Sequence, residues 1–462
     1  MDKRELHHAL KILPEVCIGC SNCMRVCPTH ALRISNGKAI LYPNRCIDCG
    51  ECYRVCPVNA IIVEQDDFNI IFEYKRRVAL IPAVLLGQFT EDVTTDDIHT
   101  ALIQLGFTDV FEVENSADFV GEYINKYLAD PDKPKPVISS FCPAIVRLIQ
   151  VKYPALVDNI MLLKPPLDLS AMYYKKMLME QGVGEQDIGI FYVTPCAAKI
   201  AAVKSPVGED KSEISGVINM DFIYNKVLKV YKNRDKEYEA LNRETACNPK
   251  NLMWSLTNGE ANFVKAKCLA IDSLDNAMEF LDKVENQEIG DVDFLEIRAC
   301  DESCAGGVLT TGNRFLTVQR LKSFFNDEKV NYDDDKANIS ICDKYRDYLV
   351  GRISVEPIAP RGIDKLDDDM TKAMKKMERI NRIMCYLPGI DCGSCGAPTC
   401  QTLAEDIVHG RAAISHCIFL QKTMEQIPML NPSHSFRIME KIWGKERFQK
   451  DCSKAKTYRI RR

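Results

Sequence analysis

The sequence predicts an α/β protein in which a larger middle domain lies between two small cysteine-rich regions. Apolar runs of strand length alternate with helix-spaced segments through the middle of the chain, and this alternation is typical of α/β folds. Three of these runs end close to a cysteine, and the cysteines outside the middle domain fall in tight, regular groups. Such grouping is not a requirement of a hydrophobic core, so the cysteines indicate metal binding.

Composition limits the classes of function. The chain has 462 residues, 46% of them hydrophobic, and a net charge of -5, which gives no general argument for nucleic acid or a membrane surface as partner. No apolar run is long enough for a signal sequence or a membrane helix, so we expect a soluble, cytoplasmic protein. In a reducing compartment, 21 cysteines indicate metal ligands rather than disulfides.

The N-terminal region repeats the pattern C-x2-C-x2-C-x3-C-P. Bacterial two-cluster ferredoxins have this pattern, and in them the fourth cysteine of each run ligates the other run's cluster. The prediction is one [4Fe-4S] cluster on Cys17, Cys20, Cys23 and Cys56, and a second on Cys46, Cys49, Cys52 and Cys27. Zinc is the alternative, but it favours two separated pairs. Residues 31–41 predict a hairpin turning at Asn36-Gly37, and 60–63 a further strand.

The middle domain reads as strands and helices in alternation. We expect a strand at 78–86, a helix at 97–105 and further strands at 109–113, 137–140, 188–193 and 294–297. The last three strands deliver Cys142, Cys196 and Cys300 to their carboxyl ends, where open α/β sheets bind ligands. No histidine lies between His99 and His409, so histidine is excluded as a ligand, acid or base in this region.

Cys300 and Cys304 stand in front of a pair of glycines, Gly306 and Gly307. Two thiolates at this spacing suit a soft metal centre, and glycines allow the backbone to approach closely. Two buried structural cysteines are the alternative.

Three segments of the middle domain resemble the signatures of the [FeFe]-hydrogenases. They are 139–143 (SSFCP), 194–199 (TPCAAK) and 296–307 (EIRACDESCAGG). The N-terminal repeats also fit this family, so the resemblance covers about residues 1–325. It implies a two-lobed catalytic domain of the iron-only hydrogenase kind.

The resemblance implies an H-cluster. Cys142, Cys196, Cys300 and Cys304 would ligate its [4Fe-4S] part, and Cys304 would bridge to a diiron subsite that carries CO, cyanide and an azadithiolate. Lys199 would hold one cyanide and act in catalysis with Cys304. The other residues implied to contact the cofactor are Ile81, Pro82, Ala83, Phe141, Thr194, Pro195 and Arg298.

The chain departs from the family where protons usually travel. Phe141 replaces a cysteine, Ala202 a glutamate, and Pro165-Pro166 a serine-proline pair, and none of these replacements exchanges a proton. Thr194 and Arg298 stand where methionines are usual. We therefore expect Glu302, or Asp301, to belong to another proton path or to tune the cluster. The alternative is an exposed acid in a loop.

The C-terminal region carries the spacing C-x2-C-x4-C-x16-C. Its ligands would be Cys392, Cys395, Cys400 and Cys417, with a helical segment at 402–415 returning the fourth thiolate. This resembles the small [4Fe-4S] domains of corrinoid iron-sulfur proteins and of sensory hydrogenases; zinc is the alternative. Before it, 372–384 predicts a helix with an apolar face of Met374, Met377, Ile380 and Ile383.

The predicted domains are 1–73 (ferredoxin-like), 74–325 (catalytic), 326–384 (linker and helix), 385–430 (small, mostly helical [4Fe-4S] domain) and 431–462 (basic tail). The tail is expected to be solvated, or else to dock an acidic electron-transfer partner. The function expected is an iron-sulfur oxidoreductase that interconverts H2 with protons and electrons, with low turnover or an H2-sensing role. A ferredoxin-like redox partner or a signalling protein, and diiron maturation machinery, are the partners implied. The alternative is a non-catalytic, hydrogenase-like iron-sulfur protein without the diiron subsite, which acts in electron transfer or cluster assembly.

Overall fold

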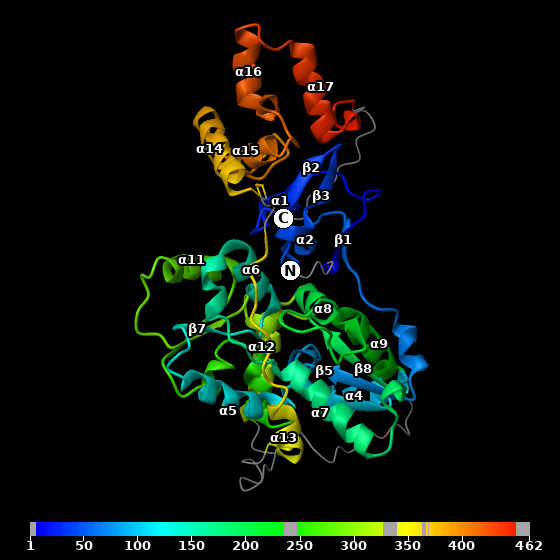
Figure 1. Ribbon diagram of the computed structural model, residues 1–462. Helices are drawn as coiled ribbons and strands as arrows, with labels where there is room; N and C mark the ends of the chain where they lie inside the picture. Colours follow the sequence, from blue (N-terminus) through cyan, green and yellow to red (C-terminus); the bar gives the residue numbers. More distant parts are fainter. Residues whose placement is uncertain (1–5, 235–246, 327–339, 363–365, 368, 450–462) are drawn as a thin grey trace. The chain divides into compact units, whose positions relative to one another are not determined.

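The computed structural model describes residues 6–234, 247–326, 340–362, 366–367 and 369–449. The chain divides into two compact units (Figure 1). The first unit comprises residues 1–46, 50–63 and 361–462, and the second comprises 47–49 and 64–360. Within the described residues, no helix combines the length and apolar character needed to cross a membrane.

The larger sheet of the second unit has four parallel strands in the order β6-β5-β8-β9 (Figure 1). The bounds are β5 (Arg76–Ile81), β6 (Asp109–Glu112), β8 (Ile188–Thr194) and β9 (Gly216–Asn219). All residues of β8 are buried, which explains its continuous apolar run. The strands predicted at 109–113 and 188–193 are confirmed.

One face of this sheet forms the main core. Ala79 and Ile81 of β5 and Phe191 and Val193 of β8 belong to it, because alternate side chains of a strand point to the same face. The helices over this core are α3 (Ala83–Leu86), α4 (Thr95–Gln104), α9 (Met220–Lys232) and α12 (Arg314–Asn326). Helix α4 confirms the helix predicted at 97–105.

The strand predicted at 78–86 is wrong in its second half. Strand β5 ends at Ile81, and residues 83–86 form the short helix α3. Pro82 separates the two, because proline has no N–H to donate to a central strand ladder. This break places Ala83 at the carboxyl edge of the sheet.

A second, three-stranded parallel sheet forms the other lobe, in the order β10-β11-β7. Its strands are β7 (Val137–Ile138), β10 (Cys268–Ile271) and β11 (Phe294–Ile297). β11 matches its predicted bounds, whereas β7 is shorter than predicted. The remaining helices of at least eight residues in this unit are α5 (Ala117–Leu128), α6 (Pro143–Lys152), α7 (Pro166–Glu180), α8 (Ala197–Lys204) and α11 (Leu274–Glu285).

Part of the segment expected to be a linker packs within the second unit. Helix α13 (Arg346–Val350) buries Leu349, and Cys342 and Ile353 beside it are also buried. The backbone N–H of Val355 donates to the carbonyl of Leu162. Residues 340–360 therefore complete this unit rather than separate it from another. Residues 327–339 of the expected linker lie outside the described residues.

The N-terminal part of the first unit contains two antiparallel pairs. β2 (Leu32–Ser35) and β3 (Lys38–Leu41) form the predicted hairpin, and Asn36 and Gly37 at its turn both have positive φ, 49° and 70°. β1 (Leu10–Ile12) pairs with β4 (Ile61–Val63), the further strand predicted. Short helices α1 (Asn22–Arg25) and α2 (Glu51–Arg54) follow the cysteine loops.

The C-terminal part of the same unit is mostly helical. Its helices are α14 (Met370–Tyr386), α15 (Cys400–Val408), α16 (Ile418–Gln426) and α17 (Pro432–Trp443). The predicted helical segment 402–415 is too long, because α15 ends at Val408 and Gly410 has a φ of 74°. The apolar face predicted for α14 is half wrong: Ile380 and Ile383 are buried, but Met374 and Met377 are 62% and 50% exposed.

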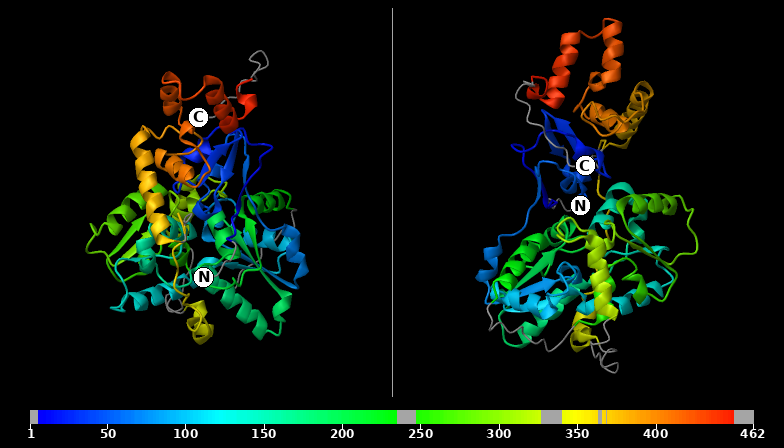
Figure 2. Two further views of the ribbon diagram at one scale, coloured as in Figure 1. Left: turned by 45° about the horizontal axis from the view of Figure 1, so that its top comes forward. Right: turned by 180° about the vertical axis from the view of Figure 1, so that it is seen from behind.

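The first residues of the expected basic tail pack against the N-terminal hairpin. Asn36 and Gly37 donate backbone hydrogen bonds to the carbonyls of Lys441 and Ile442, so α17 ends against the β2–β3 turn. Both views of Figure 2 show the red C-terminal segment beside these blue strands. A fully solvated tail is therefore wrong for residues 442–444, which are buried or half-buried, whereas Lys445, Glu446, Phe448 and Gln449 are exposed as expected. Residues 450–462 lie outside the described part.

A buried ion pair also joins the two parts of the first unit. Arg33 on β2 lies 2.6 Å from Asp406 on α15, and both side chains are only 6% exposed. The N–H of Ile34 donates to the carbonyl of Gly396 in the loop before α15. The C-terminal cysteine loop is thus held against the N-terminal hairpin.

Candidate active site and iron-sulfur centres

The first predicted N-terminal ligand set lines one pocket. The residues that line this pocket include all four cysteines of the set, Cys17, Cys20, Cys23 and Cys56. Burial and the neighbouring thiols of Cys20, Cys17 and Cys56 raise the pKa of Cys23 to about 12. The fourth cysteine of the second run therefore lies with the first run, as the crossed ligation pattern requires.

The second N-terminal set shows the same crossing. Burial, followed by the thiols of Cys46 and Cys27, raises the pKa of Cys52. Backbone N–H groups point at several of these sulfurs: Ala31 donates to Cys27 and Ala60 to Cys56, at 3.1 and 3.2 Å. Such hydrogen bonds stabilise thiolate and tune a bound cluster.

The predicted C-terminal ligands also share a pocket. Cys392, Cys395, Cys400 and Cys417 line it. Cys400 begins α15 and Cys417 is the residue before α16, so two helix starts and one glycine-containing loop bring the four sulfurs together. The side chain of Asp391 accepts a hydrogen bond from the backbone N–H of Cys400 at 2.6 Å, which fixes the loop.

The middle-domain cysteines come from both lobes. Cys142 and Cys196 are the residues immediately before α6 and α8, and Cys300 and Cys304 follow β11. Burial raises the pKa of Cys196 to about 12, with the thiols of Cys304 and Cys142 adding to the shift. At least Cys142, Cys196 and Cys304 therefore lie together. Helix N-termini favour negative charge, which suits thiolates at Cys142 and Cys196.

The paired glycines are required by close backbone contacts. A Cβ at Gly306 would lie 1.9 Å from the carbonyl oxygen of Asp301, and one at Gly307 would lie 2.5 Å from that of Pro195. The N–H of Leu309 also donates to Pro195 at 2.9 Å. The loop after β11 is thereby pressed against the segment that carries Cys196.

Lys199 lies in the first turn of α8 and is only 6% exposed. Its Nζ is 3.8 Å from the Sγ of Cys304 and donates to the hydroxyl of Tyr192 at 3.3 Å. Burial acts to lower the pKa of Lys199, but the Cys304 thiolate and Tyr192 outweigh it, so the pKa is raised. A buried ammonium group needs an anionic partner, so this place suits an anionic ligand beside Cys304.

Phe141 lies between two cations. The guanidinium carbon of Arg298 is 3.9 Å from the centre of its ring, and Lys199 Nζ is 4.4 Å from the same centre. Thr194 is, with Arg298, a departure from the family pattern at this site. Its hydroxyl donates a hydrogen bond to the carbonyl of Cys196 at 3.0 Å. The two residues that replace methionines are therefore anchored in the protein, and Arg298 brings a buried positive charge.

Arg298 belongs to a buried cluster that sequence reasoning missed. Its guanidinium pairs with Glu260 at 3.0 Å and Glu296 at 3.3 Å, and all three side chains are at most 2% exposed. The hydroxyl of Ser139 donates to Glu260 at 2.6 Å. Burial raises the pKa of Glu260 to about 7, although Arg298 opposes the shift. Nothing in the sequence indicated that Glu260 belongs to the site, because it lies in a loop far along the chain from every motif.

Ala83 has a protein partner at the place where the resemblance implies a cyanide contact. Its backbone N–H donates to Glu114 at 2.9 Å. Ser255 donates to the other oxygen of the same carboxyl group, and burial raises the pKa of Glu114 to about 7. Glu114 is a second buried acid that the sequence did not indicate.

Asp301 and Glu302 lie in the loop between the two cysteines. Asp301 is exposed and pairs with Arg314 at 2.6 Å. Glu302 has a left-handed backbone, φ 59°, and its N–H donates to Asp272 at 3.1 Å. The proton role expected for either residue stays a prediction.

Comparisons with known proteins agree with these sites. Residues 75–225 match the family "Iron only hydrogenase large subunit, C-terminal domain". Residues 16–61 match the 4Fe-4S dicluster domain, and residues 387–419 match an Fe-S cluster family.

The chain is 25% identical to iron hydrogenase 1 of Clostridium pasteurianum over 256 residues, which are 52% of this chain and 42% of that protein. It is 24% identical to the NADP-reducing hydrogenase subunit HndD of Solidesulfovibrio fructosivorans over 50% of this chain and 38% of that protein. A solved variant of the [FeFe]-hydrogenase HydA1 from Chlamydomonas reinhardtii aligns with a TM-score of 0.47 and 18% identity, covering 62% of this chain and 94% of that one.

The chain thus spans less than half the length of these two sequence relatives. The match nevertheless includes the segments that carry Cys142, Cys196 and Lys199. The cysteine groups on either side of the match each belong to an iron-sulfur family of their own. Residues 75–225 are therefore similar to the iron-only hydrogenase large subunit, and the segments before and after this region are similar to iron-sulfur cluster domains.

Proposed function

We propose that this protein interconverts H2 with protons and electrons at an H-cluster. The observation that supports this best is the meeting of Cys142, Cys196 and Cys304 with a buried lysine 3.8 Å from the last of them. An ammonium group at a cluster of thiolates, away from solvent, suits a cofactor with anionic ligands.

The residues present fit the H-cluster. Cys142, Cys196, Cys300 and Cys304 would hold its [4Fe-4S] part, and Cys304 would also bind the diiron subsite. When bound, that subsite supplies the cleavage and formation of H2. Lys199 would donate to one cyanide, and the ring of Phe141 packs against its ammonium group, 4.4 Å from Nζ to the ring centre.

The protein is proposed to turn over slowly or to sense H2. Phe141, Ala202 and Pro165 carry no group that exchanges protons. Proton transfer by a positioned side chain contributes about 10²–10⁴-fold to rates, so losing the usual relay slows the reaction unless another group replaces it. The extra C-terminal cluster domain also fits a sensory role.

Electrons are proposed to pass between the C-terminal and N-terminal clusters of the first unit. A Cβ at Gly393, next to Cys392, would lie 3.0 Å from the Cε of Met24, next to Cys23. The two cysteine loops are therefore neighbours. The proposed partner that exchanges electrons with these clusters is a ferredoxin-like protein or a signalling protein in the cytoplasm. Diiron maturation machinery is the second proposed partner, because it would insert the diiron subsite.

One observation favours the alternative, a non-catalytic iron-sulfur protein. The N–H of Ala83 donates to Glu114, in the segment that the resemblance places against a cyanide. In this alternative the middle site holds only a cubane and transfers electrons.

Formation of HD from H2 in D2O tests the two candidates. Protein matured with the diiron machinery is expected to form HD, and Cys304→Ala is expected to form none above background, because it removes the shared ligand. Cys268→Ala is the matched control, since Cys268 lies in strand β10 outside the ligand set. Fully matured protein that forms no more HD than Cys304→Ala would favour the non-catalytic candidate.

A further inference from the structure

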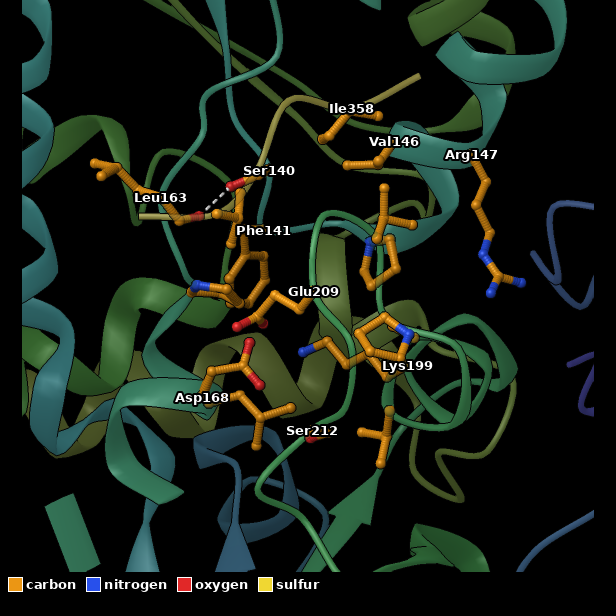
Figure 3. Close-up of a pocket in the computed structure, with 18 residues that line it drawn as sticks. Ser140, Phe141, Val146, Arg147, Leu163, Asp168, Lys199, Glu209, Ser212 and Ile358 are labelled. Atoms are coloured by element: carbon orange, nitrogen blue, oxygen red, sulfur yellow. Dashed lines mark hydrogen bonds between the residues drawn. The ribbon is translucent and has the colours of Figure 1, made fainter. Parts of the chain in front are cut away.

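The three positions that lost their protic residues line a single pocket. Phe141, Ala202 and Pro165 all contribute to its wall, and its cavity volume is about 100 Å³ (Figure 3). Most of the remaining wall is apolar, with Val146, Leu163, Leu167, Val203, Val355 and Ile358 among its residues. The sequence separates these positions, and the fold brings them together.

Asp168 is an acid in this pocket. It lies in the first turn of α7, and its carboxylate points into the space that Lys199 and Glu209 also face (Figure 3). Among the described residues, the structure shows no protein group donating a hydrogen bond to this carboxylate, and the charged groups that stabilise its charge are Lys164 and Lys199. An acid with free acceptor sites in a roomy pocket suits contact with water.

The opposite acid, Glu209, is held by an ion pair. Lys164 Nζ contacts its carboxylate, and their side chains are 12% and 21% exposed. Ser212 lines the same side of the pocket. This pair offers water a polar entrance, whereas the wall beyond it is apolar except for Asp168, Lys199, Arg147 and Ser140.

Lys199 connects the pocket to the candidate active site. It lines the pocket, and its Nζ is also 3.8 Å from the Sγ of Cys304. The ring of Phe141 lines the same wall and lies against the ammonium group. The buried end of the pocket is therefore beside the proposed diiron ligand. Asp301 and Glu302 do not contribute to its wall.

We propose that Asp168 is the proton-exchanging carboxyl of this pocket and carries protons between solvent near Glu209 and the buried end at Lys199. This rests on the proposed function and replaces the relay that Phe141, Ala202 and Pro165 have lost. Burial raises the pKa of Asp168 to about 6, while Lys164 and Lys199 oppose the shift. A carboxyl that titrates near neutral pH both accepts and releases protons.

Asp168 gains and then loses one proton each time a proton passes through the pocket. A hydronium ion on the solvent side gives a proton to an Oδ of Asp168 and is left as water, and Asp168 becomes a neutral carboxylic acid. The O–H bond then breaks as the proton passes to water at the Lys199 end, and the carboxylate is restored. No electron moves through Asp168, and the direction reverses when H2 is oxidised.

Infrared titration of the carboxyl groups tests Asp168 without relying on turnover. In protein that carries its [4Fe-4S] clusters but no diiron subsite, the wild type is expected to show a carboxylic acid band with a midpoint near pH 6, in addition to the bands of Glu114 and Glu260 with midpoints near pH 7. Asp168→Asn should lack the band with a midpoint near pH 6. Asp221→Asn should keep it, and is the matched control because burial also raises the pKa of Asp221 in the first turn of a helix. If the spectrum of Asp168→Asn keeps the band with a midpoint near pH 6, so that its difference from the wild type shows no loss of a carboxylic acid, the assignment is overturned.

Formation of HD by matured protein tests the delivery of protons. Asp168→Asn is expected to be about 10²-fold slower than Asp221→Asn, and Asp168→Glu, which keeps a carboxyl, should recover most of the rate. Equal rates for Asp168→Asn and Asp221→Asn would overturn the role of Asp168 and leave the proposed function standing. A large loss in Glu302→Gln with none in Asp168→Asn would also overturn it. A matured wild type that forms no HD rejects the proposed function instead, and with it the delivery role.

Discussion

Replacing Lys199 by methionine is expected to release most of the diiron subsite while the cubane clusters stay bound. Hydrogen bonds from charged groups contribute about 1.5–3 kcal/mol, so losing this donor should weaken retention about 10- to 150-fold. The effect is large because Lys199 is 6% exposed and methionine has no hydrogen-bond donor to replace its ammonium group. The measurement is the iron bound per chain in excess of the cubane complement, together with HD formation.

Lys204→Met is the matched control for this change. Lys204 ends the same helix, but its side chain is 32% exposed and pairs with Asp66 at 2.7 Å. It should retain the extra iron and the exchange rate of the wild type. If Lys199→Met retained both as well, Lys199 would not hold an anionic ligand.

Replacing Arg298 by methionine is expected to cost about 3–5 kcal/mol of unfolding free energy at pH 8, because Glu260 and Glu296 would be left buried without their cation. The loss should depend on pH. Burial already holds the pKa of Glu260 near 7, above its ordinary value, and removing Arg298 raises it further. The folded variant then binds more protons than the unfolded chain, so its stability falls as pH rises through about 4.5 to 7.

Denaturant unfolding at pH 5.5 and pH 8 measures this difference. The deficit of Arg298→Met against wild type should be clearly smaller at pH 5.5, where Glu260 is protonated. Arg314→Met is the control, because the Arg314–Asp301 pair is 38% and 51% exposed and should contribute little at either pH. A deficit that is equal at both pH values would contradict the account of the buried cluster.

The cysteine sets were predictable because metal ligation imposes fixed spacings along the chain. The crossed pairing of Cys56 with Cys17, Cys20 and Cys23 follows from such a rule, and these four residues do line one pocket. Strands β8 and β11 were predictable for a similar reason, since they are buried throughout and read as continuous apolar runs.

The buried acids were not predictable. Glu114, Asp168 and Glu260 lie in segments without a motif, and their partners come from distant parts of the chain, as the Glu260–Arg298 pair illustrates. Their raised pKa values come from burial, which depends on the complete fold. The sequence did mark Arg298 as unusual, but it could not show that two carboxylates surround its charge.

Errors of secondary structure have local causes. The apolar run at 78–86 hides a proline that ends β5 and starts a helical turn. The helical spacing of Met374 and Met377 predicted burial, but only Ile380 and Ile383 of that face meet a core. Periodicity identifies the apolar face of a helix, but it does not determine how much of that face is covered.

The infrared spectrum of the matured protein tests the central claim most directly. Bound CO and cyanide absorb where protein groups do not, so the account predicts bands of both ligands that are absent before maturation. The same bands should be lost in Cys304→Ala and kept in Cys268→Ala. Matured protein with a full complement of cubane iron but without CO and cyanide bands would contradict the hydrogenase function and leave an electron-transfer protein.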